Sequence, residues 1–245
     1  MFRLFTAERE YNFARRQTDE GAYLVYLYAA TGLIGFSLAI QMLQSLSLAI
    51  VLRRGRRSGK YTPPVTVLKP LKGVDDGLEA NLESFCRQDY PEYQLVLSAQ
   101  DEEDPALEVA RRIRDKFSDV DIEVVCEPGS RGLNPKVSNL LSCFSHAKHE
   151  ILLISDSNVR AKPEYLGETV SKLEDENVML VSNVIRGTDE RSFSAGLENL
   201  HLNTFVAGNV TFLQAIVGRQ CVVGKSMMMR RETLELLGGL EAYKD

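Results

Sequence analysis

Asp156 is the first residue whose type and position point to chemistry. It follows an unbroken apolar run of strand length, Ile151–Ile154, and its neighbours Ser155, Ser157 and Asn158 are also polar. A run that is apolar on both faces predicts a central strand of a parallel sheet, and open α/β sheets bind ligands just outside the carboxyl ends of such strands. A carboxylate there can hold a hard divalent cation, which in turn can hold a diphosphate. The alternative is that Asp156 caps the turn or helix that follows.

A second acid, Asp101, also follows a predicted strand, Gln94–Ala99. It opens a run of acids that precedes a helix predicted to begin at Pro105. Acids favour the first turn of a helix, so a solvated capping turn is the alternative for Glu102–Asp104. Asp101 differs because it stands first, at the strand tip. If its strand and the strand before Asp156 are near neighbours, both acids point into one crevice.

The elements that must position these acids alternate between strand and helix from Tyr61 onward. Strands are predicted at Val65–Leu68, Gln94–Ala99, Ile122–Cys126, Ile151–Ile154, Val178–Asn183 and Cys221–Arg230. Helices are predicted at Gly77–Cys86, Pro105–Phe117, Pro135–Ala147, Pro163–Leu173 and Arg231–Leu237. This order predicts an α/β fold with a doubly wound, mostly parallel sheet. The first strand is not followed by a GxGxxG motif and the chain has no GxxxxGK[ST] loop, which disfavours a dinucleotide-binding or P-loop domain.

The composition is that of an ordinary globular protein, with a hydrophobic content of 44% and a formal net charge of −5. Nucleic-acid-binding proteins usually carry a basic surplus, so this charge argues against nucleic acid as a partner. The four cysteines form no CxxC pair. A zinc site is therefore disfavoured, and buried reduced thiols are predicted instead.

One segment, Ala22–Leu52, carries no charged residue over 31 residues, and about 20 apolar residues suffice to span a bilayer. We therefore predict one transmembrane helix there, after a polar segment at residues 1–21, rather than a buried helix of a soluble protein. A basic linker at residues 53–62 follows, and it contains Arg53, Arg54, Arg56, Arg57 and Lys60. By the positive-inside tendency, the domain at residues 63–245 is expected on the cytoplasmic side.

Four short runs of residues together resemble those of one enzyme family. They are Lys69–Asp75 (KPLKGVD), Gln100–Asp101 with Asp104–Pro105, Gly132–Lys136 (GLNPK) with Asn139–Leu140, and Asp156–Ser157. On these runs, the chain from about Pro63 to its last residue resembles the ceramide glucosyltransferases, which are membrane-bound GT-A glycosyltransferases. It is also similar to the bacterial hopanoid-biosynthesis glycosyltransferases, which share much of the pattern.

The resemblance implies a UDP-sugar donor, usually UDP-glucose, a lipid alcohol such as ceramide as the acceptor, and transfer with inversion. Asp101 matches the aspartate that faces the nucleotide. Asp156, with Ser157 beside it, matches the aspartate that holds Mg²⁺ or Mn²⁺ under the diphosphate. The third position of the usual Asp-x-Asp is Asn158 here, so metal ligation from this stretch depends on one carboxylate.

Three further residues are expected near the donor. Lys136 is placed to meet the nucleotide or its phosphates as a point charge, although a solvated helix residue is the alternative. Lys69 and Pro70 end the first predicted strand and are expected to line the uracil pocket.

The last part of the chain has a looser pattern. Gly196–Gly218 has few charges and is expected to form one or two helices, either under the acceptor site or dipping into the membrane interface, with plain core packing as the alternative. The resemblance places the general base a few residues past Asp245, so no catalytic base is predicted within the chain and a carboxyl-terminal truncation is expected. Two other functions stay open: a hopanoid-lipid or polysaccharide glycosyltransferase of the same fold, and a catalytically inactive, membrane-anchored nucleotide-sugar-binding protein.

Overall fold

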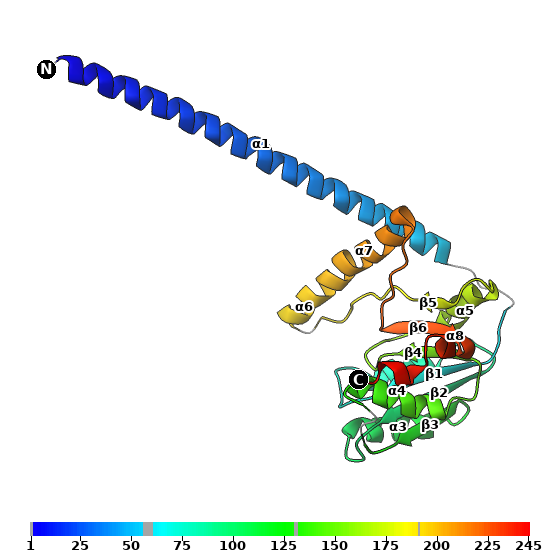
Figure 1. Cartoon of the computed structure of the whole chain (residues 1–245). Coiled ribbons are helices and arrows are strands. Elements are labelled where there is room, and N and C mark those ends of the chain that lie inside the picture. The colour runs from blue at the N-terminus through cyan, green and yellow to red at the C-terminus, as the bar shows by residue number, and fades with distance from the viewer. Residues whose placement is uncertain (1, 56–60, 130–131, 191) are drawn as a thin grey trace.

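Among the residues that the structure describes, six strands form one sheet that organises the chain from residue 61 onward (Figure 1). The computed structural model describes residues 2–55, 61–129, 132–190 and 192–245. The strands are β1 (Val65–Pro70), β2 (Tyr93–Ala99), β3 (Asp121–Cys126), β4 (Ile151–Ser155), β5 (Leu180–Ser182) and β6 (Ser226–Arg230). Their order is β3-β2-β1-β4-β6-β5, in which β3, β2, β1 and β4 are parallel and β6 is antiparallel to both of its neighbours.

The strand order changes direction at β1, and this is the place where an open α/β sheet forms its ligand crevice. From β1 the chain moves outward through β2 to β3, and it then returns to β4 on the other side of β1. The register pairs Leu68 of β1 with Val96 of β2 on one side and with Ile154 of β4 on the other. The carboxyl ends of β1, β2 and β4 therefore meet at one edge of the sheet.

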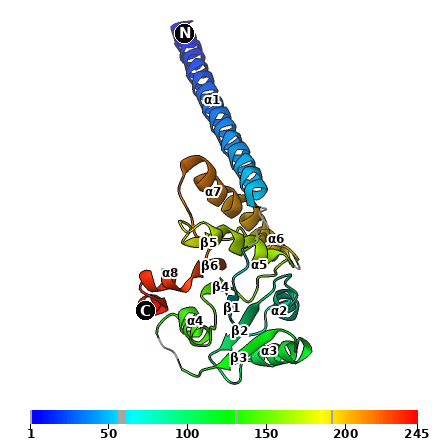
Figure 2. The ribbon, with the colours of Figure 1, turned by 90° about the vertical axis from the view of Figure 1, so that its right-hand side faces the viewer.

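Helices cover both faces of the sheet because the strands are apolar on both faces (Figure 2). Helices α2 (Leu78–Cys86), α3 (Pro105–Lys116) and α5 (Tyr165–Val170) pack on one face, and α4 (Pro135–Ser145) and α8 (Arg231–Leu236) pack on the other. Successive strand residues alternate between the two layers, so that Val67 joins the first core and Leu68 joins the second. This confirms the α/β class and the mostly parallel sheet predicted from the alternation of elements.

Helix α1 (Phe2–Gly55) projects from the sheet domain as one long rod. Its part Gly21–Arg53 is long and apolar enough to cross a membrane, and little of it is buried inside the protein. The helix expected at residues 22–52 is therefore present, and it continues back into the polar segment at 1–21. Of the expected basic linker, residues 56–60 lie outside the described residues.

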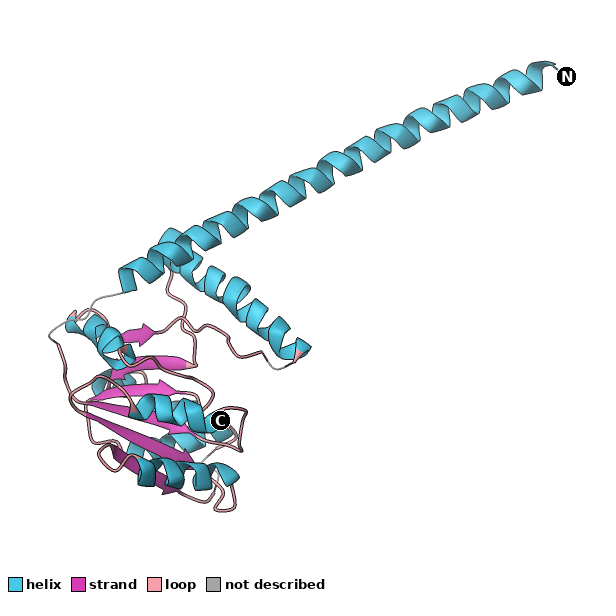
Figure 3. Ribbon diagram, turned by 180° about the vertical axis from the view of Figure 1, so that it is seen from behind, coloured by secondary structure: helices cyan, strands magenta, loops and turns pink. Residues whose placement is uncertain are grey.

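A second apolar helical segment, here called the crossing helix, runs from Phe193 to Val217 and crosses α1 (Figure 3). It consists of α6 (Phe193–Leu200), the π-helical η2 (His201–Val206), α7 (Ala207–Phe212) and the π-helical η3 (Leu213–Val217). Helix α7 packs against α1, where Gln44 Nε2 donates a hydrogen bond to Asn209 Oδ1 at 2.9 Å. The helical region expected at Gly196–Gly218 is thus one continuous segment.

Several expected elements are shorter in the structure. The strand expected at Cys221–Arg230 is limited to β6, because only those residues pair with β4. The helix expected from Pro163 begins at Tyr165 and ends in a 3₁₀ turn, η1 (Ser171–Glu174). The strand expected at Val178–Asn183 is reduced to the short edge strand β5. All four cysteines are free as predicted, but only Cys86 and Cys143 are buried, whereas Cys126 is half-buried and Cys221 is exposed.

Candidate functional site

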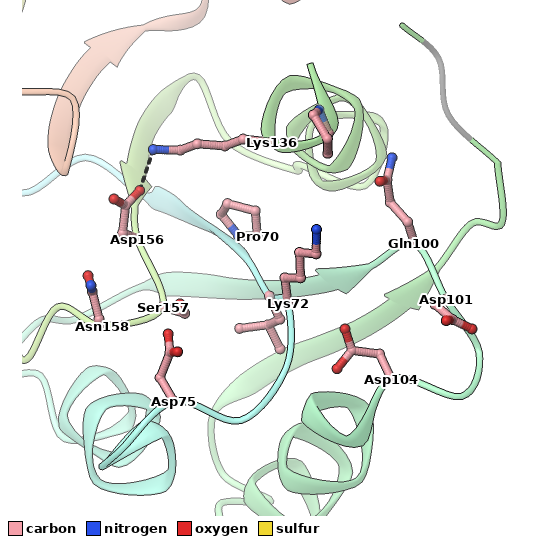
Figure 4. Close-up of a pocket in the computed structure, with 12 residues that line it drawn as sticks. Pro70, Lys72, Asp75, Gln100, Asp101, Asp104, Lys136, Asp156, Ser157 and Asn158 are labelled. Atoms are coloured by element: carbon pink, nitrogen blue, oxygen red, sulfur yellow. Dashed lines mark ion pairs between the residues drawn. The ribbon is translucent and has the colours of Figure 1, made fainter. Parts of the chain in front are cut away.

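A pocket opens at the carboxyl ends of β1, β2 and β4 (Figure 4). It is lined by Pro70, Leu71, Lys72, Asp75, Gln100, Asp101, Asp104, Pro135, Lys136, Asp156, Ser157 and Asn158. Both strand-tip acids predicted from the sequence are in this set, Asp101 after β2 and Asp156 after β4. They are separated by the end of β1, so they lie on opposite sides of the pocket rather than side by side.

Asp156 faces the first turn of α4, and its partner there is Lys136. Lys136 Nζ lies 2.5 Å from Asp156 Oδ1. That oxygen is buried and makes no hydrogen bond to the rest of the described residues, so the ion pair is its one recorded polar contact. The structure therefore brings together the predicted metal ligand and the predicted phosphate-binding lysine.

The GLNPK run places Lys136 by forming the start of α4. Asn134 is the N-cap, and its side-chain oxygen accepts hydrogen bonds from the backbone N–H groups of Lys136, at 3.2 Å, and Val137, at 3.3 Å. Pro135 occupies the first helical turn, where its missing N–H removes no helical hydrogen bond. The positive end of the α4 dipole and the Lys136 ammonium group thus lie at the same wall of the pocket, a suitable place for phosphate.

Asp101 lies at the opposite rim and has a local hydrogen bond. Its Oδ1 accepts from the backbone N–H of Glu103 at 3.0 Å, and the residue is exposed. Nothing else among the described residues holds this carboxylate in a hydrogen bond. It is free to accept a hydrogen bond from a ligand that enters the pocket.

Lys69 does not line the pocket, contrary to the expectation from the sequence. Its side chain is fully buried beneath the pocket floor, where Nζ donates to Ser155 Oγ at 3.2 Å and to the Asp156 carbonyl oxygen at 2.8 Å. The ammonium group also lies 3.8 Å from the centroid of the Phe85 ring. Burial lowers the pKa of Lys69 to about 7, against a raising effect of the Asp156 charge. Lys69 therefore fixes the end of β4, whereas its neighbour Pro70 lines the pocket. That this pocket takes the uracil ring stays a prediction.

Asp104 takes the capping role that the sequence offered as the alternative for Glu102–Asp104, and it makes a further contact that the sequence did not predict. It is the N-cap of α3, and its Oδ1 accepts from the Ala106 N–H at 2.8 Å. Both of its carboxylate oxygens also accept from the Gly73 N–H, each at 3.0 Å. Asp104 thus clamps the loop after β1 to the start of α3. The Asp-Pro pair signals the cap, but the bond to Gly73 depends on tertiary structure.

Two buried asparagines hold the loops that form the pocket floor. Asn139 on α4 donates from Nδ2 to the Leu71 carbonyl at 2.9 Å and accepts at Oδ1 from Ser98 Oγ at 2.5 Å. Asn81 on α2 donates from Nδ2 to the Ser157 carbonyl at 3.4 Å. Sequence reasoning missed Asn81, although its place on the buried face of an amphipathic helix is a usable signal, because a buried amide requires a partner.

The residues of the pocket fit a cation that takes most of its ligands from a bound diphosphate. The described residues contain no cluster of three or more His, Cys, Asp or Glu side chains that could enclose a metal ion. Asp156 Oδ1 is a buried acceptor whose partner within the described part of the chain is the Lys136 cation alone, so it can accept another cation in that place. Mg²⁺ in phosphate-binding sites is commonly held by one or two carboxylates, with substrate phosphates and waters as the other ligands.

Comparison with known protein families finds one match that covers most of the chain. The profile of glycosyl transferase family 21 matches residues 29–245. Ceramide glucosyltransferase 1 of Caenorhabditis elegans is 30% identical over 187 residues, which are 74% of this chain and 39% of that protein. The ceramide glucosyltransferase of Komagataella phaffii is 34% identical over 132 residues, 51% of this chain and 26% of that protein. The chain thus spans well under half the length of these curated relatives.

The fold also matches that of solved glycosyltransferases. A mannosyltransferase from Pyrobaculum calidifontis, solved in complex with GDP-Man and Mn²⁺, superposes with a TM-score of 0.58 at 23% sequence identity. The match covers 82% of this chain and 57% of that chain. The sheet domain therefore has the GT-A glycosyltransferase fold.

Proposed function

The chain belongs to glycosyl transferase family 21, and we propose on this basis that it takes part in moving a sugar from a UDP-sugar to the hydroxyl group of a membrane lipid. The proposed sugar is glucose and the proposed acceptor is ceramide, following the names of the curated relatives. UDP as the nucleotide is what the resemblance of the sequence motifs implies. The transfer inverts the anomeric carbon, because the lipid oxygen attacks from the side opposite the departing diphosphate. The residues of this chain supply the donor half of the site.

One observation supports this proposal above all: the Asp156 carboxylate, the Lys136 ammonium group and the amino end of α4 converge on one pocket wall at the switch point of the sheet. An anion is favoured by the helix end and by Lys136, and a cation is favoured by Asp156. A diphosphate that carries a divalent cation satisfies both demands. The exposed Asp101 at the opposite rim is left to hydrogen-bond the nucleoside.

The proposed cofactor is Mg²⁺ or Mn²⁺, with Asp156 as its protein ligand. When bound, the cation neutralises the charge that develops on the departing diphosphate. Lys136 then contributes a second positive charge to the diphosphate, and Pro70 and Ser157 bound the space that the donor fills. Lys69 lies beneath the pocket and positions the end of β4 through its hydrogen bonds to Ser155 Oγ and the Asp156 carbonyl oxygen. We assign no described residue as the general base for the lipid hydroxyl.

The proposed location is a membrane, with α1 crossing the bilayer once through Gly21–Arg53. Basic residues follow the apolar part of α1 in the sequence, which favours the cytoplasmic side for the sheet domain. The donor pocket would then face the aqueous side that supplies nucleotide sugars, while the acceptor arrives from the lipid phase.

Donor binding is tested by isothermal titration of UDP and UDP-glucose into the detergent-solubilised chain, with and without Mn²⁺. We expect binding that depends on Mn²⁺ and that falls at least about tenfold in Asp156→Asn, because the variant loses the charged ligand. A chain that binds neither nucleotide under any condition contradicts the proposal.

The acceptor is tested separately by offering ceramide, a hopanoid alcohol and an oligosaccharide together with UDP-glucose. Glucosylated ceramide supports the proposal, and product from one of the other acceptors alone reassigns the acceptor.

A further inference from the structure

The crossing helix, Phe193–Val217, carries large apolar side chains that neither the sheet domain nor α1 covers. Phe193 is 83% exposed, and Leu197, Leu200 and Phe205 are also exposed. Phe193, Leu197 and Leu200 follow one another at intervals of four and three residues, so they lie on one face of α6. The segment is long and apolar enough to be a candidate membrane span by length and composition.

Two asparagines in the first half of the crossing helix are bound to the loop that follows β5. Asn203 accepts from the Gly187 N–H at 2.8 Å and donates to the Gly187 carbonyl at 3.0 Å. Asn199 donates to the Thr188 carbonyl at 3.3 Å. These two asparagines are four residues apart, so they lie on the same face of the helix, and this face contacts the loop after β5. The exposed apolar side chains lie on the other side of the helix.

The middle of the crossing helix packs closely against α1. Gly208 lies so near α1 that a Cβ atom on it would be 3.2 Å from Gln44 Cβ, and Gln44 donates to the neighbouring Asn209. Ser47 of α1 and Thr211 of α7 are both fully buried in this part of the molecule. Small residues at this contact therefore let α1 and α7 approach each other closely.

The contact is located near one end of the apolar part of α1. A helix rises 1.5 Å per residue, so Gln44 lies about 32 Å along the axis from Tyr23, close to the roughly 30 Å thickness of a bilayer core. The apolar part of α1, Gly21–Arg53, is about 50 Å long by the same rise and exceeds the core, so its last residues lie outside the hydrocarbon when the core begins near Tyr23. In this placement Gln44 is at the boundary on the side of the sheet domain, and the crossing helix meets α1 at the level of the membrane surface.

The chain connections exclude a second membrane crossing by this helix. A helix that crosses a bilayer has its two ends on opposite sides. Here Asn203, in the first half of the helix, is bound to Gly187, a few residues after β5, and the chain returns to Val223, whose N–H donates to Ser182 Oγ of β5 at 2.8 Å. Residues 218–222 join Val217 to Val223 by six Cα–Cα steps, which span at most about 22 Å. That distance is too short to return across a core of about 30 Å.

We propose that the crossing helix lies along the bilayer surface on the side of the sheet domain, with Phe193, Leu197, Leu200 and Phe205 inserted among the lipid acyl chains. Its partner is the lipid bilayer itself, and α1 is the anchor that holds it at this level. Glu198 is the one acidic residue in the segment, and it can stay at the head-group level. Together, α1 and the crossing helix fix the orientation of the sheet domain on the membrane.

The chain contains no tryptophan, so a single introduced tryptophan reports its own surroundings. We would prepare Leu197→Trp, Leu200→Trp and Phe205→Trp in the full chain, reconstitute each into phosphatidylcholine vesicles, and measure emission and quenching by lipids brominated at different acyl positions. We expect emission at shorter wavelength than in water for all three, with strongest quenching by the lipid brominated nearest the head group. The depth should be the same for all three positions, because the helix lies in the membrane plane.

Leu236→Trp on α8 is the matched control, since Leu236 is also apolar and exposed but lies on the sheet domain. It should emit at long wavelength and show no quenching by brominated lipid. A depth that increases steadily from position 197 to position 205 would instead show a membrane-crossing helix and overturn the proposal. Emission from all three positions like that of the Leu236→Trp control would show that the helix lies in water, and it would overturn the proposal as well. Because α1 still anchors every variant, loss of membrane attachment cannot imitate that result.

Discussion

Lys136 Nζ lies 2.5 Å from Asp156 Oδ1 across the wall of the pocket, so a lysine of the chain occupies the oxygen to which a divalent cation would bind. Asp156 follows β4 and Lys136 is in the first turn of α4, so the pair also joins the sheet to one of its covering helices at the pocket. In the proposed donor complex the cation takes the place of the ammonium group at Asp156, and Lys136 turns to the diphosphate.

The first prediction is that Lys136→Met strengthens cation binding to the free protein while it weakens nucleotide binding. The variant removes a positive charge that competes for Asp156, and both side chains are partly exposed, so the effect on Mn²⁺ affinity should be modest, about three- to tenfold. UDP affinity in the presence of Mn²⁺ should fall by a similar factor, because one charge on the diphosphate is lost. Titration of Mn²⁺ and of UDP into the same preparations measures both changes.

Lys72→Met is the control for this prediction, because Lys72 also lines the pocket but is not the partner of Asp156. It removes the same charge from the same pocket. If Lys72→Met raises Mn²⁺ affinity as much as Lys136→Met does, the total charge of the pocket explains the effect. The prediction that Lys136 competes with the cation for Asp156 is then wrong.

The second prediction concerns Asn158, which stands where an Asp-x-Asp run would have its second carboxylate. Asn158→Asp should raise Mn²⁺ affinity by about tenfold, because hard cations prefer charged oxygen ligands and Asn158 lines the same pocket as Asp156. The gain should vanish in the double variant Asp156→Asn/Asn158→Asp. An equal gain in the double variant would mean that the new carboxylate binds Mn²⁺ elsewhere.

That Asp101 and Asp156 line one pocket at the same edge of the sheet was predictable from the alternation of strands and helices, but their placement on opposite sides of it was not. Parallel strands present their carboxyl ends at one edge, so acids that follow two such strands meet there. The position of β1 between β2 and β4 was not predictable in the same way, and neither was the antiparallel direction of β6. Strand order depends on which long-range contacts form, and local patterns do not record them.

The burial of Lys69 was not predictable either, because lysine is almost never fully buried and its charge favours water. The structure compensates this burial with Ser155 Oγ, the Asp156 carbonyl and the Phe85 ring, which come from β4 and α2. The crossing helix is a similar case. Its apolar composition was visible in the sequence, but its contact with α1 at Gln44 was not.

The third prediction separates Asp101 from Asp104, two acids of one run that the structure uses differently. Asp104→Ala should lower the free energy of unfolding by about 1 kcal/mol or more, because it removes the N-cap of α3 and the acceptor of the Gly73 N–H. Asp101→Ala should leave stability nearly unchanged, because its one internal hydrogen bond is exposed. Denaturant unfolding of both variants measures the difference.

The two variants should also differ in how they bind UDP. Asp101→Ala should weaken UDP binding directly, because the proposed nucleoside contact is lost. Asp104→Ala should weaken it only as far as the loop around Gly73 loosens. Unchanged UDP affinity in a folded Asp101→Ala variant would remove Asp101 from the donor site.

The fourth prediction is a dependence of stability on pH that comes from Lys69. Burial lowers its pKa to about 7 in the folded protein, from a value of 10.5 when unfolded. Between these values the unfolded chain carries the extra proton, so the free energy of unfolding rises as pH increases through 7, and it levels off below about pH 6, where both states are protonated. From pH 7 to 8.5 this rise amounts to about 1.6 kcal/mol.

Lys69→Met should abolish this rise, and Lys72→Met should keep it. The measurement is denaturant unfolding of the full chain in detergent at several pH values from 6 to 8.5. It stops there because burial raises the pKa of Cys86 and Cys143 to about 12, so ionisation of the unfolded thiols lowers stability at higher pH. An undiminished rise in Lys69→Met would show that another group releases the proton on folding, and that the Lys69 amine beneath Asp156 stays charged.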